Sequence, residues 1–304
     1  MNIDDITPFF VDKILDAIYK KSPSGPRTFG FEYEFLPRVE LTPKDMYRLY
    51  DFLPQLGFMG ENARFESSSG MYITFEPGGQ IEYHSPPVME RDMTGFIRAN
   101  DLIRTTNRAI MDELGIEYVP TGYIADRTDA PLCLETERYM ELSARLKKSG
   151  TRGLEMMKGT GSIHLHVLIK SPEELSRLFF KVCGIALMED FLMGRERRDI
   201  WNRTDTSRCG LPFYSPLDEN GHEHILEDYV RFTLAAYDIH AKCPYHNSPG
   251  VSADSFFRHM TTIFTDVRLN LRGPTIELRT LDSMPPMYFE LKWKKFVSMF
   301  ENTT

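Results

Sequence analysis

The chain has 304 residues, of which 41% are hydrophobic and 26% are charged, and its formal net charge is -8. This composition is typical of a globular protein with a sizeable core, and the negative charge argues against a nucleic-acid-binding surface. No apolar run approaches the roughly 20 residues of a membrane-spanning helix. The four cysteines are far apart, and the first residues are acidic where a secretion signal is basic, so we expect a cytoplasmic protein.

Helical and strand periodicities alternate along the chain with no repeat, linker or low-complexity segment. Amphipathic periodicity predicts helices at 5–21, 43–56, 92–114, 172–193, 227–239, 254–264 and 288–300. Alternating periodicity predicts strands or hairpins at 27–36, 65–76, 80–86, 118–123, 159–170 and 267–282. The segment 124–158 is expected to be a loop followed by a helix. We therefore predict one α+β domain over residues 1–304.

The first long strand has one charged face. Glu32 and Glu34 alternate with Phe31, Tyr33 and Phe35, so both carboxylates point to the same side. Two carboxylates on one strand face repel each other unless they are solvated or bridged by a cation. This segment alone leaves a solvated sheet face and a cation site as equally good interpretations.

The strand at 159–170 is patterned in the same way. Ile163, Leu165 and Val167 alternate with His164 and His166, which places both imidazoles on one side, about 7 Å apart at their Cα atoms. A His-x-His pair by itself is a weak indication of a metal site. Two hydrogen-bonded histidines on a half-exposed sheet are the simpler interpretation.

The recurrence of this pattern favours a functional site. Four predicted strands carry polar residues two positions apart: Glu32 and Glu34, Gln80 and Glu82, His164 and His166, and Glu277 and Arg279. If these strands are neighbours in one antiparallel sheet, their polar face is a funnel of carboxylates with imidazoles and an arginine. Oxygen-rich sites select Mg²⁺ or Mn²⁺, which commonly assist phosphoryl transfer from nucleotides.

An arginine-rich segment from 195 to 213 also contains Trp201, one of two tryptophans. We expect this segment to be a loop. Arginines clustered in a loop suit carboxylates or phosphates, although a solvated charged helix end explains the composition equally well.

Six ordered segments between about residues 28 and 282 resemble the carboxylate–amine ligases of the glutamine synthetase fold, and in particular the plant and proteobacterial type of glutamate–cysteine ligase. They are GFEYE at 30–34, QIE at 80–82, MMKGTGSIHLH at 156–166, RRDIWNRTDTSRCGLPF at 197–213, FRHMTTIFTDVR at 257–268 and IELRTLD at 276–282. The resemblance implies an antiparallel sheet that forms a funnel-like active site with flanking helices.

The resemblance also implies a reaction between small-molecule substrates. ATP phosphorylates the γ-carboxylate of glutamate or a similar acid, and an amine such as cysteine attacks the acyl phosphate. The implied metal ligands for Mg²⁺ or Mn²⁺ are Glu32, Glu34, Glu82, His164 and Glu277. His166 is implied to contact the nucleotide phosphates, Arg279 to face the transferred phosphoryl group with Glu277 as its catalytic partner, and Arg197, Trp201 and Arg208 to line the amino-acid pocket.

Three departures from the plant type leave the acceptor amine open. That type has Gln and Asn where this chain has His164 and His166, and residues 270–275 add length before the last signature strand. The chain also ends 22 residues after Asp282, where the family usually continues. The alternatives are a phosphotransferase on the same kind of sheet and a non-catalytic nucleotide- or peptide-binding relative.

Overall fold

The computed structural model describes residues 2–61, 64–89, 92–149, 151–212 and 221–300. Its main sheet has ten strands in the order β13-β14-β8-β1-β5-β4-β3-β2, with β6 and β7 also paired to β1. The strands are β1 Thr28–Pro37, β2 Phe58–Glu61, β3 Arg64–Ser67, β4 Tyr72–Phe75, β5 Ile81–His84, β6 Val88–Met89, β7 Tyr118–Val119, β8 Ser162–Leu168, β13 Val267–Asn270 and β14 Thr275–Asp282. Every pairing between them is antiparallel, which confirms the α+β class.

The helices account for the amphipathic segments. They are α1 Ile3–Lys21, α2 Pro43–Phe52, α3 Met93–Leu114, α4 Glu137–Ser149, α5 Gly153–Gly159, α6 Leu175–Ala186, α7 Arg195–Asn202, α8 Gly221–Ala235, α9 Ala253–Met260 and α10 Pro286–Ser298. Short 3₁₀ turns lie at Leu53–Leu56, Pro172–Glu174, Glu189–Phe191 and Tyr245–Asn247, and two small sheets pair β9 Cys209–Gly210 with β12 Phe264–Thr265 and β10 Tyr237–Asp238 with β11 Cys243–Pro244. None of the described helices is long and apolar enough to span a membrane.

Two predictions of local structure were wrong. The start of the arginine-rich segment is helix α7 and not a loop, because Ile200 and Trp201 provide a buried apolar face beneath its charged residues. The helix expected over 172–193 is divided, since α6 ends at Ala186 and a separate 3₁₀ turn follows.

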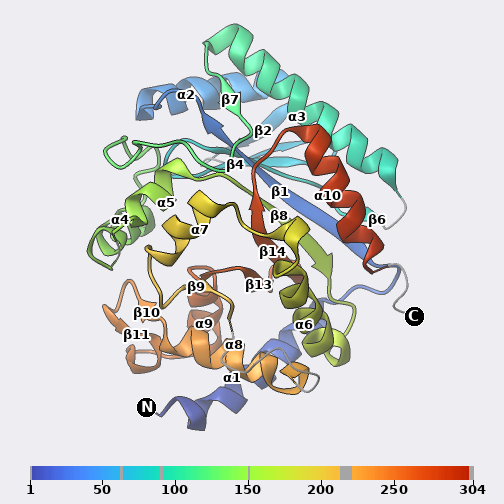
Figure 1. Cartoon of the computed structure of the whole chain (residues 1–304), viewed down its shortest axis with the longest axis vertical. Coiled ribbons are helices and arrows are strands. Elements are labelled where there is room, and N and C mark those ends of the chain that lie inside the picture. Colours follow the sequence, from blue (N-terminus) through green and yellow to red (C-terminus); the bar gives the residue numbers. More distant parts are fainter. Residues whose placement is uncertain (1, 62–63, 90–91, 150, 213–220, 301–304) are drawn as a thin grey trace.

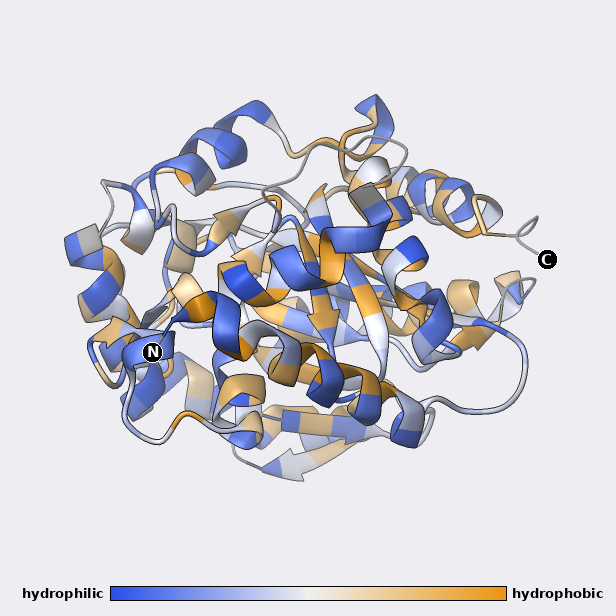
Figure 2. Cartoon of the chain, turned by 90° about the horizontal axis from the view of Figure 1, so that it is seen from below, coloured by the Kyte–Doolittle hydropathy of each residue, from blue (hydrophilic) through white to orange (hydrophobic). Residues whose placement is uncertain are grey.

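Aromatic side chains fill one face of the sheet. Phe31 of β1 lies 5.1 Å from Phe289 and 5.6 Å from Trp293, both in α10, and Phe96 of α3 stacks on Trp293 at 5.0 Å between ring centroids. Figure 1 shows α3 and α10 together on one side of the sheet and α4, α5 and α7 together on the other. In Figure 2, hydrophilic and hydrophobic residues interleave along the helices, as amphipathic packing requires. This arrangement leaves the opposite face of the sheet to polar side chains.

The strand register decides which polar side chains become neighbours. Glu32 lies directly opposite His84 in β5 and His164 in β8. Glu34 lies opposite Glu82, and Glu277 lies opposite His166. Directly opposed residues in an antiparallel sheet have Cβ atoms only about 5 Å apart, so these side chains must interact. The four signature strands are therefore consecutive in the order β14-β8-β1-β5.

Candidate active site

The polar face of the sheet forms the floor of a cavity of about 840 Å³, which lies toward the upper end of the range for small-molecule sites. The residues of its floor are Glu32, Glu34, Glu82, His84, His164, His166 and Arg279. Side chains from α4, α5, α7 and α9 line the same cavity. Of the predicted site residues on the sheet, only Glu277 lies beneath the cavity lining, fully buried.

Glu32 is the centre of this floor. Its Oε2 lies 2.5 Å from Nδ1 of His164, and its Oε1 lies 3.3 Å from Nδ1 of His84 and 3.4 Å from Nε2 of His166. Burial by itself would raise the pKa of Glu32, but the three neighbouring imidazoles lower that pKa well below its usual value. Glu32 is therefore an ionised carboxylate surrounded by nitrogen atoms of three imidazole rings.

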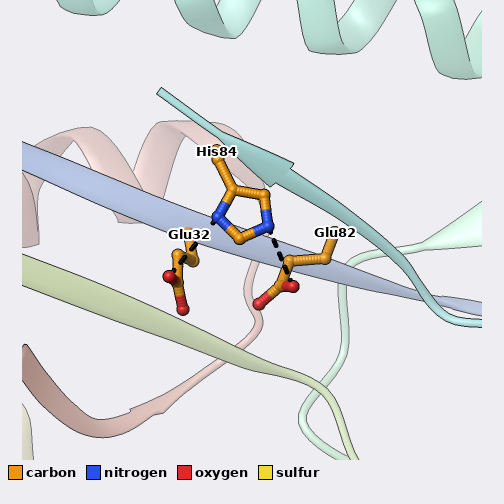
Figure 3. Close-up of side chains that lie close together, drawn as sticks. All are labelled: Glu32, Glu82 and His84. Atoms are coloured by element: carbon orange, nitrogen blue, oxygen red, sulfur yellow. Dashed lines mark ion pairs between the residues drawn. The ribbon is translucent and has the colours of Figure 1, made fainter. Parts of the chain in front are cut away.

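His84 is a site residue that the sequence-based site prediction omitted. Figure 3 shows its ring between the carboxylates of Glu32 and Glu82, and its Nε2 lies 3.0 Å from Oε2 of Glu82. Burial opposes a charged ring, but Glu82 and Glu32 raise the pKa of His84 well above its usual value. The ring stacks on Tyr72 at 4.1 Å between centroids. The signal was present in the sequence, because His84 continues the alternation that begins at Gln80.

Three groups of side chains on this floor or directly beneath it could each hold a divalent cation. They are Glu32 with Glu82 and His84, Glu32 with His166 and Glu277, and Glu34 with Glu82 and His164, and the ligand atoms of each group lie within 4.8 Å of one another. The carboxylate oxygens suit both Mg²⁺ and Mn²⁺, whereas the imidazole nitrogens suit a transition-metal ion better than Mg²⁺. Among the described residues, the buried Nε2 of His166 forms no hydrogen bond of normal geometry and only approaches Oε1 of Glu32 at 3.4 Å, which fits an atom that can bind a ligand.

The protonation of two neighbouring groups also fits cation binding. Burial and the charge of Glu82 raise the pKa of Glu34 to about 7. Burial and the positive charge of Arg279 lower the pKa of His164 to about 4, although Glu32 opposes this shift. His164 is thus neutral near pH 7, which is the form that binds metals, whereas a cation that binds Glu34 competes with a proton near that pH.

Glu277 is enclosed by donors from two strands. Its carboxylate accepts hydrogen bonds from Arg268 and Asn270, each at 2.7 Å, and from Nη1 of Arg279 at 3.1 Å. Burial would raise the pKa of Glu277, but the charge of Arg268 dominates the favourable interactions that lower this pKa to about 2. Arg279 lines the cavity and also lies 3.4 Å from Nδ1 of His164.

The three residues predicted to line an amino-acid pocket differ in their access to the cavity. Trp201 does line the cavity, and its Nε1 donates a hydrogen bond to the carbonyl of Phe264 at 2.8 Å. Arg197 and Arg208 are fully buried and are not among the cavity-lining residues.

Both buried arginines instead contact other groups of the protein. Arg197 binds Asp282 at 2.7 Å and the carbonyl of Thr280 at 2.5 Å, and Arg208 donates to the carbonyl of Thr262 at 2.8 Å. Nη1 of Arg197 and Nε and Nη2 of Arg208 have no hydrogen-bond partner among the described residues, so the expectation that these arginines contact substrate stays a prediction. Phe213, the last residue of that motif, lies outside the described residues.

Two further cavity residues gave no recognised signal in the sequence. Glu76 follows β4 directly, and burial together with the charges of Glu82 and Glu34 raises its pKa well above the usual value. Tyr139, at the start of α4, lines the same end of the cavity. Glu76 continues the alternation of Tyr72 and Thr74, which also line the cavity, whereas the placement of Tyr139 depends on tertiary packing.

The fold and the site together define a class: an α+β protein whose antiparallel sheet presents carboxylates, imidazoles and an arginine to a cavity suited to divalent cations and phosphates. Residues 28–188, more than half of the chain, match the family described as "Glutamate-cysteine ligase family 2(GCS2)". The chain therefore belongs to the glutamate–cysteine ligase family 2.

Curated relatives agree with this assignment. The chain is 28% identical over 251 residues to the chloroplastic glutamate–cysteine ligases of Medicago truncatula and Solanum lycopersicum, a match that covers 70% of this chain and 47% and 46% of theirs. It is 26% identical over 249 residues to glutamate–cysteine ligase A, chloroplastic, of Oryza sativa subsp. indica, with 70% of this chain and 48% of that protein covered. The chain thus spans about half the length of the curated relatives it matches.

Proposed function

We propose that the protein is an ATP-dependent carboxylate–amine ligase. It activates the γ-carboxylate of glutamate, or of a similar acid, as an acyl phosphate and joins it to an amine such as cysteine. The observation that supports this proposal is the meeting of Glu32, Glu82, His164 and Arg279 on one cavity floor in a member of this family. The proposal includes a funnel-like active site of the glutamine synthetase type.

In this proposal Glu32, Glu34, Glu82, His164 and Glu277 hold Mg²⁺ or Mn²⁺, which neutralise phosphate charge and orient the γ-phosphoryl group of ATP. His166 was expected to contact the nucleotide phosphates. Its position in the group with Glu32 and Glu277 supports a role as a metal ligand as well.

The proposed reaction has two steps, and Arg279 assists the first of them. The acid's γ-carboxylate oxygen attacks the γ-phosphorus, and the bond to the leaving oxygen of ADP breaks. Arg279 contacts the phosphoryl oxygens during this transfer, because its guanidinium lines the cavity and its buried Nε has no hydrogen-bond partner among the described residues. The amine nitrogen then attacks the acyl carbon, phosphate leaves and the nitrogen loses a proton.

Burial of the cavity floor protects the proposed acyl-phosphate intermediate from water. Glu34, Glu82, His164 and His166 are all at most 9% exposed, so a bound substrate there is largely shielded from water. An acyl phosphate is prone to hydrolysis, and exclusion of water protects it until the amine arrives. Arg197 and Arg208 contribute indirectly by holding the wall that contains Trp201. We place the reaction in the cytoplasm, as the sequence predicts, although the relatives named above are chloroplastic.

A panel of acid and amine pairs, scored for ADP release with ATP and Mn²⁺, tests the proposal. A ligase releases ADP only when both an acid and an amine are present. A phosphotransferase releases ADP with a single acceptor and leaves a stable phosphorylated product. A non-catalytic relative binds ATP without releasing ADP, and that result across the panel would refute the proposed function.

A further inference from the structure

Three imidazole rings approach the single carboxylate of Glu32. His84 belongs to β5, and His164 and His166 belong to β8, so the rings come from the strands on either side of β1. Directly opposed side chains in an antiparallel sheet lie only about 5 Å apart, so the strand register brings His84 and His164 to Glu32. The floor therefore offers more nitrogen donors than Mg²⁺ requires, because Mg²⁺ takes oxygen ligands.

The three candidate cation groups have the same composition and are connected to one another. Each contains two carboxylates and a different imidazole. The group of Glu32, Glu82 and His84 shares Glu32 with one of the other groups and Glu82 with the second. We call these three residues the linking group. An ion bound to the linking group would influence both neighbouring groups through a common carboxylate.

The ring of His84 is held by neighbouring side chains of the sheet. Oγ1 of Thr74, in β4, lies 2.7 Å from Nε2 of His84 and 2.7 Å from Oε2 of Glu82. The ring stacks on Tyr72 at 4.1 Å between centroids with an interplanar angle of 9°, and the guanidinium of Arg64 lies 3.8 Å from the centroid of Tyr72. The ring is thus held at one edge and on one face.

These contacts decide which nitrogen of His84 can bind a metal. The hydroxyl of Thr74 can accept a hydrogen bond from Nε2 of His84 while it donates one to Glu82, which favours a proton on Nε2. Nδ1, which lies 3.3 Å from Oε1 of Glu32, is then the nitrogen with a free lone pair. A histidine that binds a metal through one nitrogen usually donates the other N–H to a nearby acceptor, which orients the ring. Thr74 is that acceptor for His84.

We propose that the linking group binds a transition-metal ion in preference to Mg²⁺, with Nδ1 of His84 as one of the ligands. The ion belongs to the class that takes imidazole nitrogen together with carboxylate oxygen, such as Fe²⁺, Co²⁺ or Zn²⁺. This inference rests on the metal binding included in the proposed function, and it adds a ligand and a preference that the proposed function leaves open.

Binding of such an ion replaces a proton. With both ring nitrogens protonated, His84 balances the carboxylates of Glu32 and Glu82, which lie 3.3 and 3.0 Å from it (Figure 3). An ion at Nδ1 provides this positive charge instead, and the proton from Nδ1 passes to solvent. Mg²⁺ gains little from the exchange, because imidazole is a poor ligand for it and it loses its water reluctantly. A transition-metal ion gains a nitrogen ligand.

Calorimetric titration of the full chain with Co²⁺ and with Mg²⁺, after a chelator has removed metals, tests the preference without ATP. We expect one equivalent of Co²⁺ to bind through the linking group at least about 100-fold more tightly than Mg²⁺. In His84→Gln the affinity for this equivalent should fall at least about tenfold, whereas Mg²⁺ binding should not weaken. Equal affinities for the two ions in the wild type, or the same tight Co²⁺ binding in His84→Gln, would overturn the inference.

Two further variants separate the loss of a ligand from a loss of the fold. Thr74→Val keeps a β-branched side chain and removes the hydroxyl, so the same equivalent of Co²⁺ should bind about tenfold more weakly. His240→Gln is the matched control and should bind Co²⁺ as the wild type does, because the side chain of His240 is 83% exposed and does not line the cavity. Thermal unfolding without metal shows whether each variant is folded. If His84→Gln does not fold, unchanged Co²⁺ binding by Thr74→Val overturns the inference.

The outcomes for this inference and for the ligase function are distinguishable. A preference for Co²⁺ that depends on His84, without ADP release from any acid and amine pair, would support the metal site and refute the ligase. Amine-dependent ADP release by a protein that binds Mg²⁺ and Co²⁺ equally would support the ligase and overturn the inference.

Discussion

Glu277 and Arg279 contact each other within β14, with Nη1 of Arg279 3.1 Å from Oε2 of Glu277. The contact is not a simple pair, because Arg268 and Asn270 already donate to the same carboxylate at 2.7 Å. Nε of Arg279 has no hydrogen-bond partner among the described residues. An ion pair with Glu277 therefore does not explain the unpaired Nε of Arg279, whereas binding of a ligand in the cavity by this guanidinium does.

Replacement of Arg279 should mainly slow the chemical step. Arg279→Ala should cost roughly 2.5–4 kcal/mol of barrier, on the order of 10²–10³ in turnover, because its contacts strengthen as charge moves onto the transferred phosphoryl group. Binding of ATP should weaken much less, and Arg279→Lys should restore little because an ammonium lacks the planar fork. The measurement is acid- and amine-dependent ADP release together with thermal unfolding on the same sample.

A suitable control for Arg279 is Arg104→Ala, because Arg104 is an exposed arginine of α3 whose ion pair within the described part of the chain is with Asp101 on the same helix. This variant should retain wild-type turnover. If Arg279→Ala instead lowers stability and keeps wild-type turnover per folded molecule, Arg279 is a structural residue and its catalytic role is wrong.

Divalent cations should stabilise the folded protein through Glu32. A cation at about 100 times its dissociation constant should add about 2.7 kcal/mol to the free energy of unfolding, because it binds the converging carboxylates of the folded protein and not the unfolded chain. Glu32→Gln should lose most of this gain, since Glu32 belongs to two of the three ligand groups. Glu113→Gln, at an exposed position of α3, should keep it. Thermal unfolding with Mn²⁺ and with excess chelator measures both, and an equal response in the two variants would exclude Glu32 as a ligand.

The affinity for Mn²⁺ should depend on pH through Glu34. The pKa of this carboxyl in the folded protein is about 7, so at pH 6 a proton competes with the cation, and affinity should rise roughly tenfold between pH 6 and pH 8. In Glu34→Gln the affinity should be weaker and this part of the pH dependence should be absent. Calorimetry in buffers of different ionisation enthalpy counts the protons released, and the same release from both proteins would contradict the assignment.

The same shift has a defined sign for stability without metal. The folded pKa of Glu34, about 7, lies above the ordinary value of 4.5. Folded protein therefore binds this proton more tightly than unfolded protein between those pH values, and the contribution of Glu34 to stability falls as the pH rises through that interval. Denaturant titrations without metal should give wild type and Glu34→Gln similar free energies of unfolding near pH 4.5. The two values should differ increasingly toward pH 7, with the variant the more stable.

Arg197 should behave as a structural residue. It is fully buried and binds Asp282 and two backbone carbonyls, so Arg197→Ala should lower the free energy of unfolding by roughly 3 kcal/mol. Arg195→Ala, at the exposed start of the same helix, should change it by less than about 0.5 kcal/mol. Unchanged stability of Arg197→Ala with a raised KM for the acid substrate would instead support the expectation that Arg197 contacts substrate.

The alternation of polar and apolar residues made the sheet and most of its floor predictable. A strand has a period of two, so Glu32 with Glu34 and His164 with His166 had to share a face once the apolar residues between them entered the core. The recurrence of this pattern in four strands was the sequence feature that suggested they are neighbours in the sheet. His84 obeys the same rule within the predicted strand at 80–86, on the same face as Gln80 and Glu82, but it was not included among the expected site residues.

The walls of the cavity were not predictable in this way. Arg197 and Arg208 look like ligand-binding residues in the sequence, but each also donates to backbone carbonyls, which carry no sequence signal. Tyr139 reaches the cavity because of how α4 packs over the sheet, and no local periodicity records that packing. Helical periodicity likewise shows that Met156 and Leu142 are apolar but does not show whether they face the core or a cavity.

The transfer of oxygen from the acid to phosphate tests the central claim most directly. Glutamate labelled with ¹⁸O in its γ-carboxylate is incubated with the protein, ATP, Mn²⁺ and an accepted amine, and the inorganic phosphate is analysed by mass spectrometry. If the γ-carboxylate is activated as an acyl phosphate, each phosphate released carries one ¹⁸O atom and the amide product keeps the other. Phosphate without the label, formed at the same rate as the amide, would contradict this account.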